Sequence, residues 1–165
     1  MLVVGAAFWE AVQAVHVAGS VLAFWPMFVY PFIDAVAAHR DPRAMPWFHR
    51  MQSTVGQRLV APSMFVVAAA GIYLAFDLHQ WHAFYVWWGL GVVILIGALG
   101  GAYFGPTDRR LAELAERDIA AATPGAAVSF GPEYRALRRQ IDAVGLFVAV
   151  LVLTTIYLMT VQTGA

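Results

Sequence analysis

Four stretches of the chain are apolar for long enough to cross a membrane. They cover about residues 8–38, 59–76, 84–104 and 143–161. A helix needs about 20 residues to span a hydrocarbon core. The apolar residues follow one another without the two-residue alternation of membrane β-strands. The pattern therefore predicts an all-α, polytopic membrane protein: a four-transmembrane-helix bundle that forms one domain over residues 1–165.

The first apolar stretch is the most polar of the four, and it contains Pro26 and Pro31. It begins without arginine or lysine and is longer than the apolar region of a signal peptide, so we expect a retained helix. A proline removes a backbone hydrogen bond inside a helix. We therefore expect a kink, or an early end of the helix near Asp34. That carboxylate is expected to pair with an arginine of the first connection.

All ten basic residues are arginine, and a four-helix count places all of them on one side of the membrane. Four lie in the first connection, residues 39–58, and six lie between the third and fourth spans. The N-terminus, the connection over residues 77–83 and the C-terminal tail contain none. Arginine-rich connections are typically cytoplasmic. We therefore expect a multi-pass protein of the bacterial inner membrane with both termini extracytoplasmic.

The second arginine-rich connection is predicted to contain a short cytoplasmic amphipathic helix over about residues 107–121. Thr107 is suited to cap it. Its apolar residues recur on one face: Leu111, Leu114, Ala115 and Ile119. Such a helix is expected to lie along the inner membrane surface. Residues 121–131 are typical of a linker, and Pro132 is expected to begin a helix that continues into the fourth span.

Composition agrees with the membrane assignment and excludes several kinds of reactive side chain. The chain is 61% hydrophobic and 12% charged, against about 45–50% and about 25% in soluble domains. Cysteine is absent, which excludes disulfides and thiolate metal sites. Lysine is also absent, so no side-chain amine is available for Schiff-base chemistry.

His16 is the strongest candidate for chemistry. It lies within the first span, where an ionisable residue is costly and usually faces the bundle interior. Imidazole is a common ligand of haem iron and transition metals. Gly19 and Ser20 would let a flat ring or a neighbouring helix approach closely, and Glu10 and Gln13 share a broad face with His16 and could orient the ring. The alternative is a neutral histidine hydrogen-bonded to another helix.

Two further histidines, His79 and His82, lie in the connection between the second and third spans. Their spacing would let one helical turn direct both toward one metal ion. With His16 on the same side of the membrane, the sequence allows a haem with two axial histidines or a three-histidine copper or zinc site. Arg58 is suited to bind a haem propionate or to reach the membrane interface. The remaining histidines are expected to be polar cytoplasmic surface: His39 and His49.

Several short motifs spread over most of the chain resemble a bacterial family of predicted integral membrane proteins of unknown function. They are VHVAG at 15–19, GQR at 56–58, AP at 61–62, GIYL at 71–74, GPTDRRL at 105–111 and YRALRR at 134–139. More distantly, the arrangement is similar to the copper-resistance D group and to the haem-associated membrane protoporphyrinogen oxidase. This resemblance implies that His16 is important. The oxidase pattern also has a lysine in the third helix, and its absence here argues against the oxidase activity while leaving haem binding open.

The sequence therefore supports two hypotheses. In the first, the protein binds haem b or a transition metal ion through His16, for electron transfer or redox sensing. In the second, it is a non-catalytic membrane subunit or assembly factor that packs against partner helices. Small residues at 97–102 would suit a homodimer or another membrane-protein partner. Contact with the lipid bilayer is expected in both cases and nucleic-acid binding in neither, and no motif decides whether the protein is an enzyme.

Overall fold

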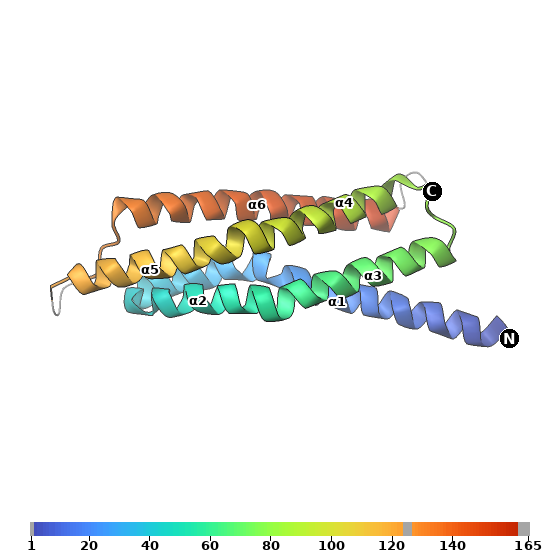
Figure 1. Ribbon diagram of the computed structural model, residues 1–165, viewed down its shortest axis with the longest axis horizontal. Coiled ribbons are helices and arrows are strands. Elements are labelled where there is room, and N and C mark those ends of the chain that lie inside the picture. Colours follow the sequence, from blue (N-terminus) through green and yellow to red (C-terminus); the bar gives the residue numbers. More distant parts are fainter. Residues whose placement is uncertain (1, 124–126, 162–165) are drawn as a thin grey trace.

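The computed structural model describes residues 2–123 and 127–161, with side chains from residue 8 onward, and these residues contain helices but no strand. Four rods form the bundle (Figure 1). The first is α1 (Leu2–Arg40), followed by the 3-10 turn η1 (Pro42–Ala44). The second is α2 (Met45–Val55), η2 (Gly56–Val60) and α3 (Ala61–Asp77). The third is α4 (Phe84–Leu99), η3 (Gly100–Phe104) and α5 (Gly105–Ala121), and the fourth is α6 (Pro132–Val161).

Each rod is long and apolar enough to cross a membrane, which confirms the all-α, four-helix, multi-pass fold. The rods run alternately up and down, so the start of α1 and the end of α6 lie at the same end (Figure 1). Their candidate spans contain 33, 36, 38 and 30 residues. At about 1.5 Å per residue these exceed a hydrocarbon core of about 30 Å. The rods therefore extend beyond the hydrocarbon core.

Two helix boundaries differ from the sequence-based expectation. The expected end of the first helix near Asp34 is wrong, because α1 continues through Pro26, Pro31 and Asp34 to Arg40. The first arginine-rich connection is largely helical rather than a loop, since α2 fills residues 45–55. By contrast, the expected helix beginning at Pro132 is confirmed, and it continues into the fourth span.

The amphipathic helix of the second connection exists, but its expected position on the membrane surface is wrong. α5 continues α4 through η3 without a break and packs against α2. Thr107 is not its cap, because the helix has already begun and the threonine is buried. The predicted apolar face is buried, and Leu111, Leu114 and Ala115 form a cluster with Met45 and Tyr134. This cluster belongs to the end of the bundle that carries the arginines. The predicted linker, residues 121–131, lies partly outside the described residues.

Two π-helical segments, η2 and η3, contact each other in the middle of the bundle. Each begins at a glycine, Gly56 or Gly100. A π-turn inserted in an α-helix interrupts the regular hydrogen-bond ladder and is frequent at functional sites. The bundle therefore has two irregular turns side by side at this level.

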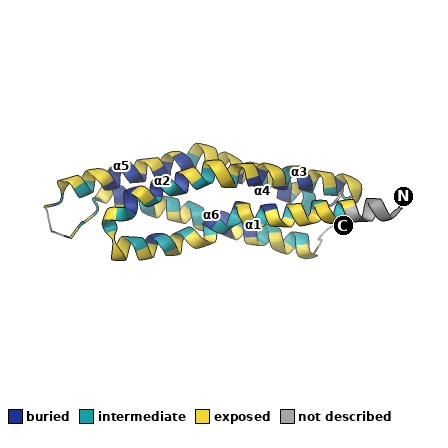
Figure 2. Cartoon of the chain, turned by 90° about the horizontal axis from the view of Figure 1, so that it is seen from below, coloured by how far each residue is buried: buried dark blue, intermediate teal, exposed yellow. Residues whose placement is uncertain are grey.

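The apolar core and the lipid-facing surface are clearly divided (Figure 2). Six buried residues form the core cluster between the spans: Ala23, Met64, Val92, Ile96, Val148 and Val152. Large apolar side chains also point outward, including Phe32, Phe65 and Leu146, which are 75%, 76% and 68% exposed. Exposed apolar surface of this extent is unusual for a soluble monomer. These faces contact the lipid of a bilayer.

Candidate functional site

His16 makes a specific contact across the bundle. Its Nδ1 lies 3.0 Å from the carbonyl oxygen of Val67 on α3. A carbonyl oxygen only accepts hydrogen bonds, so Nδ1 is the nitrogen that carries the proton and donates. The ring is half-buried. Its Nε2 consequently keeps a lone pair, as an imidazole ligand of a metal would require.

Glycines allow α1 and α3 to approach closely around this imidazole. A Cβ at Gly71 would lie only 3.0 Å from Cε1 of His16, and a Cβ at Gly19 would lie 3.1 Å from Cγ2 of Val67. The side chain of any larger residue at position 71 would therefore clash with the ring of His16. Glu10 and Gln13 are exposed, and among the described residues neither bonds to the ring.

The other predicted ligands do not gather around His16. His79 and His82 are exposed in the α3–α4 connection, where His79 has a positive φ of 55°. Within residues 8–123 and 127–161, no group of three or more histidine, aspartate or glutamate side chains is arranged to hold a metal ion. Arg58, in η2, is exposed. The structure therefore brings together neither a three-histidine site nor a His16–Arg58 pair, and the propionate role of Arg58 stays a prediction.

A second site, which sequence reasoning missed, is a cavity of about 210 Å³ between all four rods. It lies beside the two π-helical segments, and Gly56, Gly97, Gly100 and Gly101 form part of its wall. At one end the lining is apolar, with side chains such as Met64. Toward the arginine-rich end the lining is polar and charged: Asp34, His49, Gln52, Asp108, Arg138 and Asp142.

The polar end of the cavity is organised by a chain of hydrogen bonds. Gln52 donates from Nε2 to Oδ1 of Asp34 at 2.8 Å, so its Oε1 is free to accept from Nδ1 of His49 at 3.3 Å. The opposite ring nitrogen, Nε2, then accepts from the hydroxyl of Tyr134 at 2.9 Å. Each group in this series of hydrogen bonds either donates or accepts. The series therefore favours the neutral tautomer of His49 that carries its proton on Nδ1.

An ion pair closes the network at Asp34. Oδ2 of this carboxylate lies 3.0 Å from Nη2 of Arg138, whose Nε also contacts Asp142 at 3.0 Å. The expectation that Asp34 pairs with an arginine of the first connection is therefore wrong, because its partner comes from α6. His49 was expected on the surface, but it is only 1% exposed. Its burial depends on α2 packing against α5 and α6.

Two polar groups facing the cavity lack a partner. Asp108 is 8% exposed, and its carboxylate makes no hydrogen bond or ion pair with any described residue. The hydroxyl of Tyr30 is also buried without a hydrogen-bond partner among them. Buried polar groups are nearly always satisfied. An unsatisfied carboxylate and hydroxyl beside one cavity therefore indicate space for a ligand or for water.

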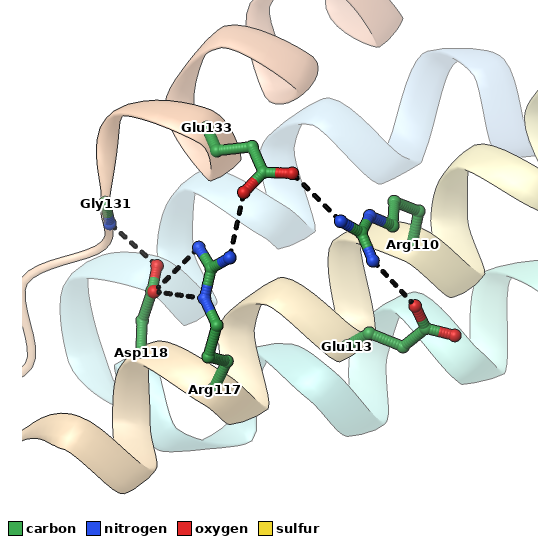
Figure 3. Close-up of polar contacts among 6 residues, drawn as sticks. All are labelled: Arg110, Glu113, Arg117, Asp118, Gly131 and Glu133. Atoms are coloured by element: carbon green, nitrogen blue, oxygen red, sulfur yellow. Dashed lines mark hydrogen bonds and ion pairs between the residues drawn. The ribbon is translucent and has the colours of Figure 1, made fainter.

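The connection that precedes α6 is tied to α5 by surface charges (Figure 3). Asp118 accepts a hydrogen bond from the backbone N–H of Gly131 at 2.7 Å. Glu133 accepts from Arg117 at 2.8 Å and from Arg110 at 2.9 Å. Glu133 and its two arginine partners are exposed, so these ion pairs orient the start of α6 more than they stabilise it. The orientation directs Arg138, further along α6, toward the cavity.

Fold and interior together define a multi-pass α-helical membrane protein with a histidine held between two helices and a polar cavity within the bundle. In comparisons with known proteins, no family model, curated protein or solved structure matches this chain.

Proposed function

We propose that this chain is a bacterial inner-membrane protein, with both termini extracytoplasmic, that binds haem b through His16 for electron transfer or redox sensing. The observation that carries the proposal is the hydrogen bond from Nδ1 of His16 to the Val67 carbonyl. Ligating histidines commonly donate their second ring N–H to a carbonyl or carboxylate, which fixes the tautomer and the ring orientation. The distant similarity of the arrangement to the haem-associated membrane protoporphyrinogen oxidase points to the same residue.

Haem is favoured over a lone transition metal ion because it needs fewer ligands from the protein. One imidazole is enough to hold haem iron, whereas a zinc site takes three or four protein ligands. No such group exists among the described residues. The haem would supply one-electron chemistry when bound, and His16 would supply the axial nitrogen. The cavity of about 210 Å³ is smaller than the roughly 300–1,000 Å³ of drug-sized pockets, so we do not assign the macrocycle to it.

Absorbance spectroscopy combined with metal analysis tests this proposal directly. Protein purified from haem-replete cells should show a Soret band and stoichiometric iron, and His16→Ala should lose both while remaining folded. His79→Ala is the matched control, since this exposed histidine should be dispensable. Stoichiometric copper or zinc in place of iron would show that the cofactor is a metal ion and not haem. If neither haem nor metal is present, the cofactor proposal fails and the packing-subunit alternative becomes the better account.

Gly71 offers a variant that leaves the imidazole itself intact. Gly71→Ala adds a Cβ about 3.0 Å from Cε1 of His16, so it should displace the ring and shift or weaken the Soret band. Gly91→Ala is the control, because a Cβ there meets nothing within 4 Å. An unchanged spectrum in Gly71→Ala would show that the ring position seen here is not the one that binds iron.

A further inference from the structure

We propose that the cavity beside η2 and η3 is a binding site for a small organic cation, with an ammonium head and a short apolar chain. This site is separate from His16, which does not line it. The proposal follows from the charge of the lining, the unpartnered groups, and the size and polarity of the cavity.

The lining carries more negative than positive charge. Its charged residues are three carboxylates, Asp34, Asp108 and Asp142, and one guanidinium, Arg138. Arg138 is already engaged by Asp34 and Asp142, and the hydrogen-bond chain through Gln52 favours a neutral His49. The side chain of Asp142 is 49% exposed, so within the interior two buried carboxylates, when ionised, face one guanidinium. A cation is the ligand that would balance this site.

Asp108 is the residue that would bind the cation head. It is more than nine-tenths buried, lines the cavity and has no ion-pair or hydrogen-bond partner among the described residues. An isolated buried carboxylate is costly unless a positive charge or a proton compensates it. Its neighbour in the lining, Tyr30, has a buried and unpartnered hydroxyl that can accept a hydrogen bond. An ammonium group in the cavity, with three N–H donors, would bind the Asp108 carboxylate.

The rest of the lining selects an organic ion rather than a metal. Beyond the charged end, the wall is formed by apolar residues: Ala23, Met27, Val60, Met64 and Ile96. These side chains suit a hydrocarbon segment and offer no oxygen ligands to a hard cation. A volume of about 210 Å³ has room for several water molecules or for a short alkyl chain. An alkylammonium ion of four or so carbons therefore matches the space.

Binding of n-butylammonium to the purified protein in neutral detergent tests the proposal. Calorimetry should show saturable binding, and the midpoint of thermal unfolding should rise with concentration, since a ligand of the native state stabilises it. Butan-1-ol and butyrate are the matched probes, with the same chain and no positive charge. Both should bind about tenfold or more weakly. Equal binding of the three, or no saturable butylammonium binding, overturns the proposal.

Two variants locate the site. Asp108→Asn keeps the shape of the side chain and removes its charge, so it should weaken butylammonium binding about tenfold or more. Asp77→Asn is the control and should leave binding unchanged, because Asp77 lies at the end of α3 that is far from the cavity. Gly97→Leu places a side chain where a Cβ meets nothing within 4 Å, so it should fill the cavity and abolish binding. Gly91→Leu, outside the cavity, is its control. Unchanged binding in both cavity variants would overturn the assignment even if butylammonium binds elsewhere.

Discussion

Arg138 is the residue on which the buried polar network depends. It lies in the polar first third of α6, and its side chain is 18% exposed while that of Asp34 is 8% exposed. An arginine of the same helix, Arg139, is exposed instead. Neighbouring residues of one type therefore differ completely in their surroundings. The YRALRR motif alone did not distinguish them, because the distinction depends on which face of α6 packs against α1 and α2.

Arg138→Leu should destabilise the protein strongly. It leaves Asp34 buried without its counter-charge, and breaking a buried pair costs about 3–5 kcal/mol. Thermal unfolding in detergent should show a large fall in midpoint, and Asp34→Asn combined with Arg138→Leu should recover part of it. Arg139→Leu serves as the control and should change little. A small effect of Arg138→Leu would mean that Asp34 is compensated in another way.

Tyr134→Phe should destabilise the protein by a smaller amount. The hydroxyl donates to Nε2 of His49, which is 1% exposed. A buried acceptor left unsatisfied costs about 1–3 kcal/mol. The free energy of unfolding of the variant should be compared with that of Tyr157→Phe, whose ring is 63% exposed. Equal effects of the two substitutions would show that the His49 hydrogen bond contributes nothing.

At the scale of elements, the four spans were predictable because a long apolar segment in lipid folds as a helix. A segment without water must satisfy its own backbone, and a helix does so. The helices α2 and α5 were harder to place, because their residues are polar enough to suit a loop or a membrane surface. Their position is set by packing against each other, a tertiary contact that no local pattern encodes. The cavity, which this packing helps to enclose, was missed for the same reason.

The packing of α2 on α5 predicts a specific cross-link. Arg50 and Glu116 form an ion pair between the two helices, so cysteines at these positions should be joined by a short bis-maleimide cross-linker, which bridges more than the roughly 7 Å between Cα atoms that a disulfide allows. The chain contains no cysteine of its own, which gives a clean background. Arg50→Cys with Arg110→Cys is the control pair, since Arg110 faces Glu133 of α6 instead. A surface-lying α5 would give no cross-link in the first pair.

The whole molecule is polar at one end and apolar along its sides. Arginines and the buried network occupy the end where α2, α5 and the start of α6 meet, and the start of α1 lies at the other (Figure 1). The sequence predicted this asymmetry from arginine placement alone, because four spans were enough to put all ten on one side. The positive-inside rule predicts that the arginine-rich end faces the cytoplasm.

Reporter fusions test that orientation. A fusion after residue 165 should report the extracytoplasmic side, and one inserted within residues 123–131 should report the cytoplasm, because the fourth span separates them. A periplasm-active enzyme and a cytoplasm-active fluorescent protein give complementary readouts at each position. Identical signals at both positions would contradict the arrangement of four spans, and exchanged signals would invert the molecule.

The pairing of Asp34 with Arg138 also has a consequence for biosynthesis. The carboxylate belongs to the first helix to be made, whereas its guanidinium partner arrives with the last. Until then, Asp34 has no guanidinium partner, and Gln52 of α2 is its hydrogen-bond donor. A chain that stops before α6 would keep this carboxylate without its counter-charge.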